Sequence, residues 1–571
     1  MTRRLRRRRS DRVAAIRPNM ALGSFLVAYL ERTGVEQIFG LPGDLVLGLF
    51  QRFGRARGLE IVTFSHEPAV GFAADGYARA SRRLGVVCVT YGAGGHNVVN
   101  AVAGAYAERV PLLVVSGGPG EAEQKVALIH HQVKDVEAQS RIFDEVCCAT
   151  AIIDRPELAA EQIHATVAAI VHEHRPGYLE IHRDLVDEKI PVPQWLCDWD
   201  GKFPRPRSNR KKLAEAVSET LDRLRAARRP LLLAGVELFR ESADRDFRRF
   251  AENTGAPVVT TVLAKGVFPM SHPLHMGISI GGASHPAIQK RVKQADLVLA
   301  LGSHRTDLNL GASRWSVPEE RSIWAVDGRV AISQHEYSEV TLGEFVRALS
   351  RAKVSRRRER ISYYDNLKRP TSGRLPRSRT IDVNDLLVEL NDFLAEHADY
   401  HVVAESGDML FGGLELRLHG KGNYFAQGFY ASMGFAVPAA MGAQIATGIR
   451  PLVLCGDGGF QMTGVEIAHA VPKRLSPLVV IVNNGGWGIF RPVTTQQGLL
   501  EIPNWPYAEM ANGWGGAGFA VNTVGELRDS LHEAHSLQRF AIIDVRVDGR
   551  DLSPLGKRYI EGSARTATTR R

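Results

Sequence analysis

The sequence Pro451-Leu-Val-Leu-Cys-Gly-Asp-Gly-Gly-Phe460, followed by Leu478-Val-Val-Ile-Val-Asn-Asn484, decides the fold. In both stretches an apolar, β-branched run leads into small or polar residues, as a buried strand does where it ends in a turn. Uninterrupted apolar runs are typical of parallel sheets that helices cover on both faces. The two stretches therefore predict two parallel strands of an α/β protein, joined by a helix.

Oxygen-bearing residues follow both predicted strands. Because parallel strands end at the same edge of a sheet, Asp457 and Asn484 should lie together there. The turn Gly456–Gly459 exposes backbone N–H groups that can bind phosphate. Asp457, Asn484 and the Gly486 carbonyl offer the hard oxygen ligands that Mg²⁺ prefers. A Gly-Asp-Gly turn or an Asn-Asn loop alone is usually only a turn. Together, over the 29 residues from Gly456 to Asn484, they predict a site for a diphosphate and Mg²⁺.

The same alternation of short apolar runs and longer amphipathic segments continues along the chain. It predicts an α/β fold of three doubly wound parallel-sheet domains, at residues 20–200, 210–350 and 380–560. A basic linker at 351–379 is expected before the last domain, and a C-terminal tail at 561–571 after it. The other predicted strands are Glu60–Phe64, Gly85–Thr90, Pro111–Ser116, Pro230–Ala234, Pro257–Thr261, Asp296–Leu301 and Ala541–Val545.

Basic residues are concentrated at the N-terminus. The formal net charge is +10, but the first twenty residues hold eight arginines and one aspartate, which leaves +3 for the other 551 residues. Residues 1–19 are therefore expected to be a disordered basic extension, with Met20 as an alternative start. No basic patch interleaved with aromatic residues is present in the sequence, so the charge does not indicate nucleic-acid binding.

The composition, 44% hydrophobic and 23% charged, is that of a globular protein. Apolar residues recur at helical spacing over Ala21–Leu30 and Gly34 follows, which predicts a first helix rather than a signal peptide. No run approaches the roughly 18 apolar residues that a membrane span needs. The five cysteines include no Cys-x-x-Cys pair and fit a reducing compartment. We therefore expect a cytoplasmic protein that does not bind membranes.

The segment from Gly456 to Asn484 closely resembles the thiamine diphosphate-binding motif. The resemblance implies that Asp457, Asn484 and the Gly486 carbonyl bind Mg²⁺ beneath the diphosphate of this cofactor. It implies further cofactor contacts from the glycines of the turn, which are Gly456, Gly458 and Gly459.

A second segment, Ser65-His66-Glu67-Pro68-Ala69-Val70, resembles the part of the family that carries an essential glutamate. The resemblance implies that Glu67 hydrogen-bonds N1′ of the aminopyrimidine and favours the tautomer whose N4′ imine removes the thiazolium C2 proton. An isolated glutamate on a turn would otherwise be an ordinary surface residue. Glu67 is therefore expected both to bind the cofactor and to act in catalysis.

Two further segments match the same family. Phe429–Pro438 resembles the segment that bends the cofactor, which implies Met433 as the hydrophobic wedge and the Ala431 carbonyl as the partner of N4′. The stretch that ends in Gly407 and Asp408 resembles the loop beside the diphosphate, which implies that both residues bind the cofactor. A lone methionine is more often part of a core, so these roles come from the resemblance alone.

Within this family the chain resembles the 2-oxo acid decarboxylases. Asp44 follows a predicted strand, the loop Leu128–Gln132 carries His130 and His131, and a loop that begins at Thr90 lies between them in the sequence. The resemblance implies that Asp44 and the histidine pair deliver a proton and assist aldehyde release, and that Thr90 binds the cofactor. Adjacent histidines would otherwise be solvated loop residues.

Over about residues 21–560 the chain is similar to bacterial phenylpyruvate and indolepyruvate decarboxylases. The glutamate that pyruvate decarboxylases carry six residues after the metal-binding asparagine corresponds here to Phe490. Phe490 and Trp487 are expected to line an apolar substrate pocket, and Asp307 to supply an acidic group. The resemblance implies non-oxidative decarboxylation of an aromatic or long-chain 2-oxo acid to an aldehyde and CO₂, through an ylid and an enamine of thiamine diphosphate.

Two alternative functions stay open at this point: a carboligase similar to acetolactate synthase, and a non-catalytic thiamine diphosphate-binding protein. Glu67 and Asp457 fall in different predicted domains, and the resemblance places the active site between two subunits. We therefore expect a homodimer or homotetramer with the site at the subunit interface. The remaining expected partner is the small 2-oxo acid substrate.

Overall fold

The computed structural model describes residues 14–125, 128–311, 317–371 and 373–568. The chain forms two compact units. Unit 1 comprises Met1–Arg205, Val437–Gly448 and Thr463–Leu475, and unit 2 comprises Pro206–Ala436, Ile449–Met462 and Ser476–Arg571. Two short pieces from the C-terminal third of the sequence thus belong to the same unit as the N-terminal third.

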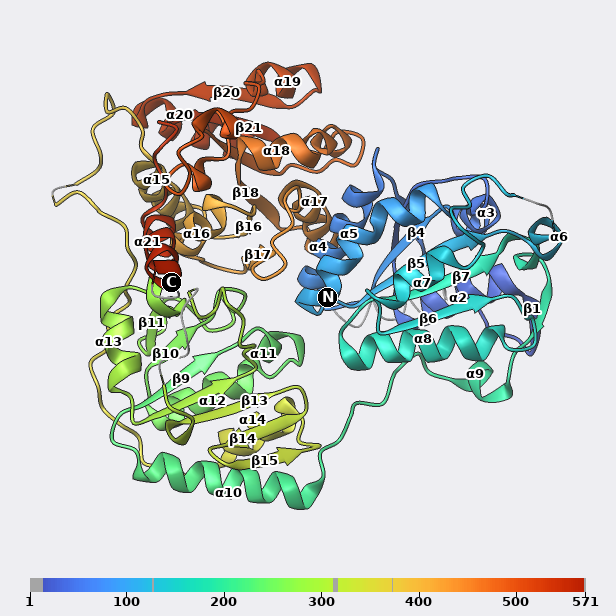
Figure 1. Cartoon of the computed structure of the whole chain (residues 1–571), viewed down its shortest axis with the longest axis horizontal. Coiled ribbons are helices and arrows are strands. Elements are labelled where there is room, and N and C mark those ends of the chain that lie inside the picture. Colours follow the sequence, from blue (N-terminus) through green and yellow to red (C-terminus); the bar gives the residue numbers. More distant parts are fainter. Residues whose placement is uncertain (1–13, 126–127, 312–316, 372, 569–571) are drawn as a thin grey trace. The chain divides into compact units, whose positions relative to one another are not determined.

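Unit 1 is built on a six-stranded sheet with the order β3-β2-β4-β5-β7-β6, in which every pairing is parallel. Its strands are β2 (Gln37–Gly40), β3 (Glu60–Val62), β4 (Gly85–Val89), β5 (Leu112–Gly118), β6 (Ala149–Ile153) and β7 (Gly177–His182). The main helices are α2 (Leu22–Thr33), α3 (Leu47–Arg55), α4 (Glu67–Ser81), α5 (Ala93–Glu108), α7 (Ala138–Asp144) and α8 (Ala159–Glu173) (Figure 1). Shorter elements are β1 (Asn19–Ala21), which pairs antiparallel with β8 (Lys189–Pro191), α6 (Glu121–Gln124), η1 (Arg183–Leu185) and α9 (Gln194–Asp198). This sheet confirms the predicted parallel α/β architecture of the N-terminal domain.

Local sequence explains where the helices of unit 1 begin and end. The predicted first helix is α2, which ends where Gly34 adopts a left-handed conformation (φ 91°) that favours glycine. Helix α4 begins at Glu67 with Pro68 in its first turn, where a missing N–H leaves no hydrogen bond unmade. Both central strands, β4 and β5, are buried along their whole length, as their uninterrupted apolar runs predict.

Two helices of unit 1 cross at close range although they are far apart in the sequence. They are α4 and α17 (Ala436–Thr447), and η4 (Gly464–Ala470) belongs to the same unit. A Cβ atom on Gly76 would lie 2.1 Å from the Ala439 carbonyl oxygen, and one on Gly442 would lie 1.9 Å from that of Ala73. Only glycine allows this approach, so these two positions fix the crossing of the helices.

The C-terminal sheet of unit 2 has the order β17-β16-β18-β19-β21-β20 and is also entirely parallel. Its strands are β16 (Tyr400–Ala404), β17 (Tyr424–Ala426), β18 (Arg450–Gly456), β19 (Leu478–Asn483), β20 (Ala517–Val521) and β21 (Ala541–Arg546). Its helices are α15 (Val383–Glu396), α16 (Asp408–Glu415), α18 (Asp457–Thr463), η5 (Gly488–Phe490), η6 (Gln497–Leu500), α19 (Tyr507–Gly513), α20 (Val524–Ser536) and α21 (Pro554–Thr568) (Figure 1). The strand-helix-strand unit predicted from residues 451–484 is confirmed as β18, α18 and β19.

The middle sheet of unit 2 corrects the prediction of a purely parallel domain. It has the order β11-β10-β9-β12-β13-β14-β15, and its last two pairings are antiparallel. Tight turns at Asp327-Gly328 and Ser333 carry positive φ angles and join β13, β14 and β15 as hairpins. Strands β14 and β15 are only four residues long and carry polar residues, so they were not predicted.

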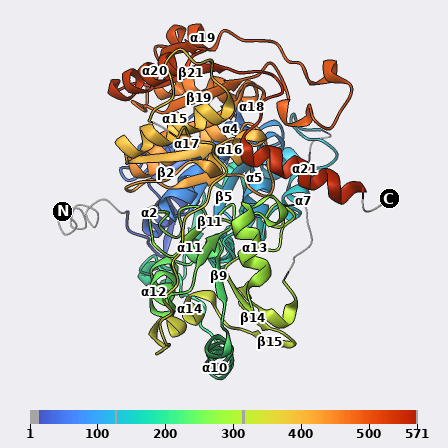
Figure 2. The same ribbon diagram turned by 90° about the vertical axis from the view of Figure 1, so that its left-hand side faces the viewer.

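The middle sheet carries its own helices. Its strands are β9 (Pro230–Ala234), β10 (Val258–Thr260), β11 (His275–Ile278), β12 (Leu297–Leu301), β13 (Ser322–Val326), β14 (Arg329–Ile332) and β15 (His335–Ser338). The helices are α10 (Arg210–Ala226), α11 (Glu237–Arg240), α12 (Asp244–Thr254), η2 (Gly281–Ala283), α13 (Pro286–Gln294), η3 (Glu319–Arg321) and α14 (Leu342–Arg351). Helix α10 lies beside α14 and the antiparallel edge strands, at one end of this sheet (Figures 1 and 2).

Two predicted boundaries shift in the structure. Residues 1–13 of the basic extension lie outside the described residues, whereas Ile16 is buried and the Ala14 N–H donates to Glu31 at 2.9 Å, so the ordered chain begins before residue 20. At the other end α21 continues to Thr568, past the predicted tail boundary at 561. Within the described part of the chain, no helix combines the length and the apolar character that crossing a bilayer requires.

Candidate functional site

The carboxyl ends of β16, β18 and β19 lie side by side in the C-terminal sheet, and Asp457 stands at the centre of this edge. One carboxylate oxygen accepts the Gly458 N–H at 2.8 Å, and the other accepts those of Gly485 at 2.7 Å and Gly486 at 3.2 Å. Burial raises the pKa of Asp457, and these backbone N–H groups act in the opposite direction. No lysine or arginine in the described part of the chain pairs with it.

The surroundings of Asp457 fit a divalent cation. The side-chain oxygen of Asn484 is buried and has no hydrogen-bond partner among the residues that the structure describes. The Gly486 carbonyl accepts the Gly488 N–H at 2.9 Å and keeps a second lone pair. A buried carboxylate, an orphaned amide oxygen and a carbonyl together are hard ligands that a bound Mg²⁺ would satisfy. The sequence prediction therefore agrees with the local geometry.

Glycines line the space next to this group. A Cβ atom on Gly456, on Gly485 or on Gly407 would meet nothing within 4 Å, so their backbones border open space. On the other face of the turn, a Cβ on Gly458 would lie 2.4 Å from the Trp487 ring and one on Gly459 would lie 2.5 Å from Glu405. The turn is thus packed on one side and open on the other, as a phosphate cradle requires.

Glu405 is a buried residue of this edge that was not predicted as a site residue. Its carboxylate accepts the N–H groups of Ser406 at 2.8 Å and Ala436 at 3.0 Å, and its side chain packs on Gly459. Burial raises the pKa of Glu405 to about 7, although the backbone N–H groups oppose the shift. Glu405 therefore connects the segment after β16 with the first turns of α17 and α18. Its position directly after β16 was the available signal, as for Asp457 after β18.

The Asp408 side chain is hydrogen-bonded within the protein and is therefore not available for direct cofactor binding. Both carboxylate oxygens contact Ser553, one accepting its N–H and the other its hydroxyl, each at 2.7 Å. Burial raises the pKa of Asp408 to about 6. Because the side chain is engaged, a cofactor contact at this position would come from the backbone at the start of α16.

The segment Phe429–Met433 presents apolar side chains to solvent. Ala431 has a positive φ of 59°, and Met433 is 36% exposed. The Ser432 N–H donates to Gln427 at 2.9 Å, and the Ser406 hydroxyl donates to the Ser432 carbonyl at 3.1 Å. An exposed methionine on a left-handed turn is not core packing, so the position of Met433 is compatible with contact to a ligand.

In unit 1, Glu67 is the first residue of α4 and points toward α5. Its carboxylate accepts the side-chain N–H of Asn97 at 2.7 Å, and a Cβ on Gly94 would lie 3.4 Å from it. The amide of Asn97 therefore orients one carboxylate oxygen. Asn97 is a site residue that the sequence did not reveal, because it lies 30 residues from Glu67 in the middle of a helix.

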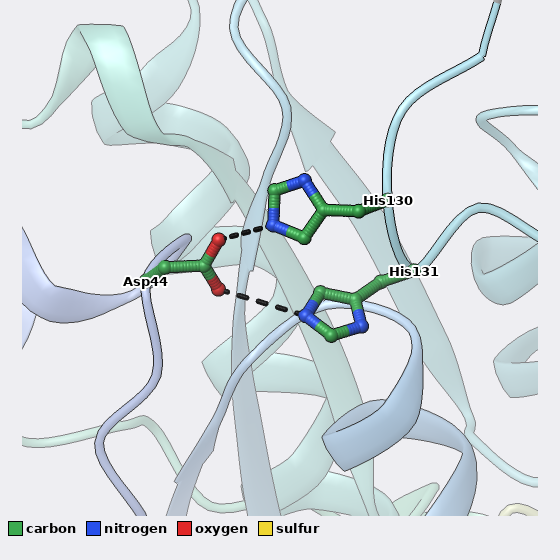
Figure 3. A group of neighbouring side chains, drawn as sticks. All are labelled: Asp44, His130 and His131. Carbon is green, nitrogen blue, oxygen red and sulfur yellow. Dashed lines mark hydrogen bonds and ion pairs between the residues drawn. The ribbon is translucent and has the colours of Figure 1, made fainter.

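Asp44, His130 and His131 form one cluster, as the sequence predicted. Figure 3 shows both imidazole rings directed at the Asp44 carboxylate: His130 hydrogen-bonds one oxygen, and His131 lies 3.7 Å from the other. The Thr90 hydroxyl lies 3.5 Å from the same carboxylate. Burial alone would raise the pKa of Asp44, but the hydrogen bond from His130 and the charges of both histidines hold it below its ordinary value. The cluster is accessible, with 44% of the Asp44 side chain exposed.

The two remaining predicted residues lie on loops of unit 2. Asp307 follows β12 in the middle domain, is exposed and accepts the Leu308 N–H at 2.8 Å. No hydrogen bond or ion pair joins it to another predicted site residue among those described. Phe490 ends η5, six residues after Asn484, and is 51% exposed. The structure thus places Phe490 on the loop of the candidate cation site, and within the described residues it shows no hydrogen bond or ion pair between Asp307 and that loop.

Comparison with known families agrees with this geometry. Residues 20–141 match the N-terminal TPP binding domain of thiamine pyrophosphate enzymes, 217–342 their central domain and 406–545 their C-terminal TPP binding domain. An indole-3-pyruvate decarboxylase of Azospirillum brasilense is 34% identical over 96% of this chain and 99% of its own. Pyruvate decarboxylase 1 of Zea mays is 31% identical over 86% and 81%, and that of Pisum sativum 29% identical over 92% and 90%.

The fold and the site define a thiamine diphosphate-binding enzyme. The chain belongs to the thiamine pyrophosphate enzymes, as a thiamine diphosphate-dependent 2-oxo acid decarboxylase. The predicted cofactor is thereby confirmed, with Mg²⁺ as the usual partner metal of this family.

Proposed function

We propose that this enzyme converts an aromatic or long-chain 2-oxo acid, of the phenylpyruvate or indolepyruvate kind, to an aldehyde and CO₂. The observation that carries the proposal is Phe490, an exposed apolar side chain six residues beyond the candidate metal ligand Asn484. A glutamate at this position would favour a small, polar substrate, whereas a phenyl ring offers apolar contact. The relative named an indole-3-pyruvate decarboxylase supports the same choice.

The C-terminal sheet supplies the residues that would hold the cofactor. Asp457, Asn484 and the Gly486 carbonyl would bind Mg²⁺, and the glycine turn would bind the diphosphate through its N–H groups. Bound thiamine diphosphate supplies the electron sink that lets the bond to the departing carboxylate break. Met433 and the Ala431 carbonyl would contact the middle of the cofactor, and Trp487 and Phe490 would border the substrate.

The residues of unit 1 handle protons. Glu67, oriented by Asn97, would hold a proton at N1′ of the aminopyrimidine. Asp44, which is hydrogen-bonded to His130 and lies 3.7 Å from His131, forms with them an acid–base group that would give a proton to the carbon left by CO₂ and then assist product release. Among the described residues, no hydrogen bond or ion pair joins Asp307 to this group, so its part rests on the family resemblance alone.

The family resemblance also suggests the assembly. We propose a homodimer or homotetramer in which Glu67 of one subunit acts with the cation site of its partner. Light scattering of the purified holoenzyme would give the mass, and a monomer of 62.7 kDa with full activity would contradict the proposal.

Aldehyde formation from phenylpyruvate, indolepyruvate, pyruvate and 2-oxoisocaproate tests the substrate class. The assay contains thiamine diphosphate and Mg²⁺ and couples the product to an alcohol dehydrogenase. We expect the highest kcat/KM for the aromatic acids. Phe490→Ala should lower the ratio of their kcat/KM to that of pyruvate by about tenfold, as the loss of apolar contact predicts. Replacement of Leu499, which is 73% exposed, is the matched control.

Two results would contradict the proposed function. A preference for pyruvate that Phe490→Ala leaves unchanged would exclude the role of this side chain. Formation of an acetolactate-like condensation product in place of aldehyde would identify a carboligase.

A further inference from the structure

A buried carboxylate lies directly behind the turn that leads into Glu67. This carboxylate is that of Glu466 in η4, a residue that is 2% exposed. It accepts the backbone N–H of Ser65 at 2.9 Å, two residues before Glu67. Both residues belong to unit 1, although 401 positions separate them in the sequence.

Neighbours of Glu466 hold the same turn. The Ser65 hydroxyl and Nε2 of His469 are 2.7 Å apart, and that nitrogen lies 3.5 Å from the Glu466 carboxylate. The ring of Phe64 lies 5.7 Å from that of His469 and 5.8 Å from the Lys473 ammonium. Residues 464–473 therefore contact the turn through its backbone, its hydroxyl and its aromatic ring.

The turn itself offers little support from its own residues. His66 is the N-cap residue of α4 and makes no side-chain hydrogen bond to the first turn of the helix, and both Ser65 and His66 are exposed. A helix that lacks a side-chain cap leaves its first turn free to shift unless other groups hold it. The N–H bond to Glu466 is such a restraint at the point where the chain enters the helix.

Glu466 is also close in sequence to the cation site. It lies nine residues after Asp457, and η4 follows α18 without a gap. One continuous stretch thus carries a candidate metal ligand at one end and the restraint on the Glu67 turn at the other.

We propose that Glu466 is a positioning residue: by accepting the Ser65 N–H, it fixes the first turn of α4 so that Glu67 meets N1′ of the cofactor. The inference rests on the proposed role of Glu67. Burial raises the pKa of Glu466, while the Ser65 N–H and the charges of His66 and Lys473 oppose the shift. If the turn moved, the buried Glu466 carboxylate and the Ser65 N–H would lose their hydrogen bond. Because an unsatisfied buried polar group costs free energy, this bond holds the turn in place.

Three substitutions separate positioning from general stability. Glu466→Ala removes the acceptor, Glu466→Asp keeps the charge but shortens the side chain, and Glu466→Gln keeps the length and one acceptor oxygen. We expect Ala and Asp to lower kcat about 10- to 100-fold with little change in KM, because small misplacements of a reacting group have effects of this size. The kcat of Glu466→Gln should stay within about threefold of the wild-type value.

The decisive readout is deuterium exchange at thiazolium C2 in the holoenzyme, which needs no 2-oxo acid. It should slow in parallel with kcat in the Ala and Asp variants. Glu344→Ala is the control, because Glu344 accepts the Ser208 N–H at 2.8 Å in the middle domain and its loss should leave exchange unchanged.

The outcomes divide clearly. Wild-type exchange in Glu466→Ala and Glu466→Asp, with slow exchange in Glu67→Gln, would overturn this inference alone. Wild-type exchange in Glu67→Gln would overturn the role of Glu67 and this inference together. Equal losses in Gln and Ala would show that the charge, not the hydrogen bond, is needed and would overturn the positioning role. The Asp and Gln variants decide the matter if the Ala variant fails to fold.

Discussion

The N-terminal and C-terminal sheets have the same construction and different uses. If the six strands of each sheet are numbered in the order in which they occur along the chain, both sheets have the strand order 2-1-3-4-6-5. Both sheets are wholly parallel. The first strand leads to Asp44 in one sheet and to Glu405 in the other. The third leads to Thr90 and to Asp457. Equivalent strand ends thus carry the candidate functional residues of both domains.

The difference lies in the environment of those residues. The Asp44 side chain is 44% exposed and faces two imidazole rings, whereas Asp457 is 2% exposed and faces backbone N–H groups. An accessible carboxylate beside two imidazole rings can hydrogen-bond a ring that carries a proton, while a buried one surrounded by amides suits a fixed ligand. On the proposed roles, the same topology would serve proton transfer in unit 1 and cofactor binding in unit 2.

The largest expected effect comes from Glu67→Gln. Turnover should fall about 10²- to 10⁴-fold, because an amide cannot exchange a proton with N1′. Binding of thiamine diphosphate, followed by tryptophan fluorescence, should change much less, since the cradle lies in the other sheet. If Glu67→Gln lost thiamine diphosphate binding while the enzyme that still held cofactor kept its turnover, the assignment of catalysis to one sheet and of cofactor binding to the other would be contradicted.

Asp457→Ala should show the opposite pattern. We expect the affinity for thiamine diphosphate and Mg²⁺ to fall by more than about 100-fold, since even groups that only support a metal ligand contribute 10- to 100-fold. Removal of Mg²⁺ with EDTA should inactivate the wild type, and added Mg²⁺ should restore it. Titration calorimetry measures the affinity, and an unchanged value would exclude Asp457 as a ligand.

Asp44→Asn should reduce kcat about 100-fold, as the loss of one acid–base group predicts, and leave cofactor affinity unchanged. Because the pKa of Asp44 is held below its ordinary value, its bond with His130 forms above that lowered pKa and is lost as the pH falls through it. Wild-type turnover should therefore not decline at pH 5 through this group. A pH profile of kcat checks this, and a decline that Asp44→Asn abolishes would show that the pKa is higher.

The smallest effect concerns Glu180, a buried carboxyl within β7 rather than at a strand end. Burial raises its pKa to about 7, and its carboxylate accepts the Tyr178 hydroxyl at 2.6 Å. The folded state therefore binds a proton between about pH 4.5 and 7 that the unfolded state releases, so this stabilisation is lost as the pH rises through that range. Glu180→Gln should reduce the change in the free energy of unfolding over this pH range by about 3 kcal/mol at most, without changing kcat. Thermal unfolding from pH 5 to 8 measures it, with Glu344→Gln as the control.

Sequence patterns were sufficient for the parts of the fold that depend on local chemistry. The apolar runs of β4, β5, β18 and β19 predicted buried parallel strands, and the glycine turn after β18 indicated a candidate cation site whose local geometry suits that use. The family resemblance brought Asp44 and the histidine pair together before any geometry was available. Strand-end residues are accessible to such reasoning because parallel topology places them at one edge.

Other features were not predicted because they depend on contacts between residues that are distant in the sequence. Asn97 and Glu466 lie within helices, and nothing in their local sequence marks them as neighbours of the Glu67 turn. The hairpin strands β14 and β15 are short and carry polar residues, so the middle sheet was predicted as purely parallel. The engagement of Asp408 by Ser553 likewise joins residues 145 positions apart.

The composition of unit 1 limits how genes of this kind can recombine. Val437–Gly448 and Thr463–Leu475 belong to the sequence of the C-terminal domain, yet the first packs on α4 and the second contacts the turn that precedes α4. A chimera that takes the first 205 residues from one parent and the rest from another would pair α4 with a foreign helix at Gly76 and Gly442, where no extra atom fits. The two cofactor-binding domains must therefore be inherited, or designed, as a matched set.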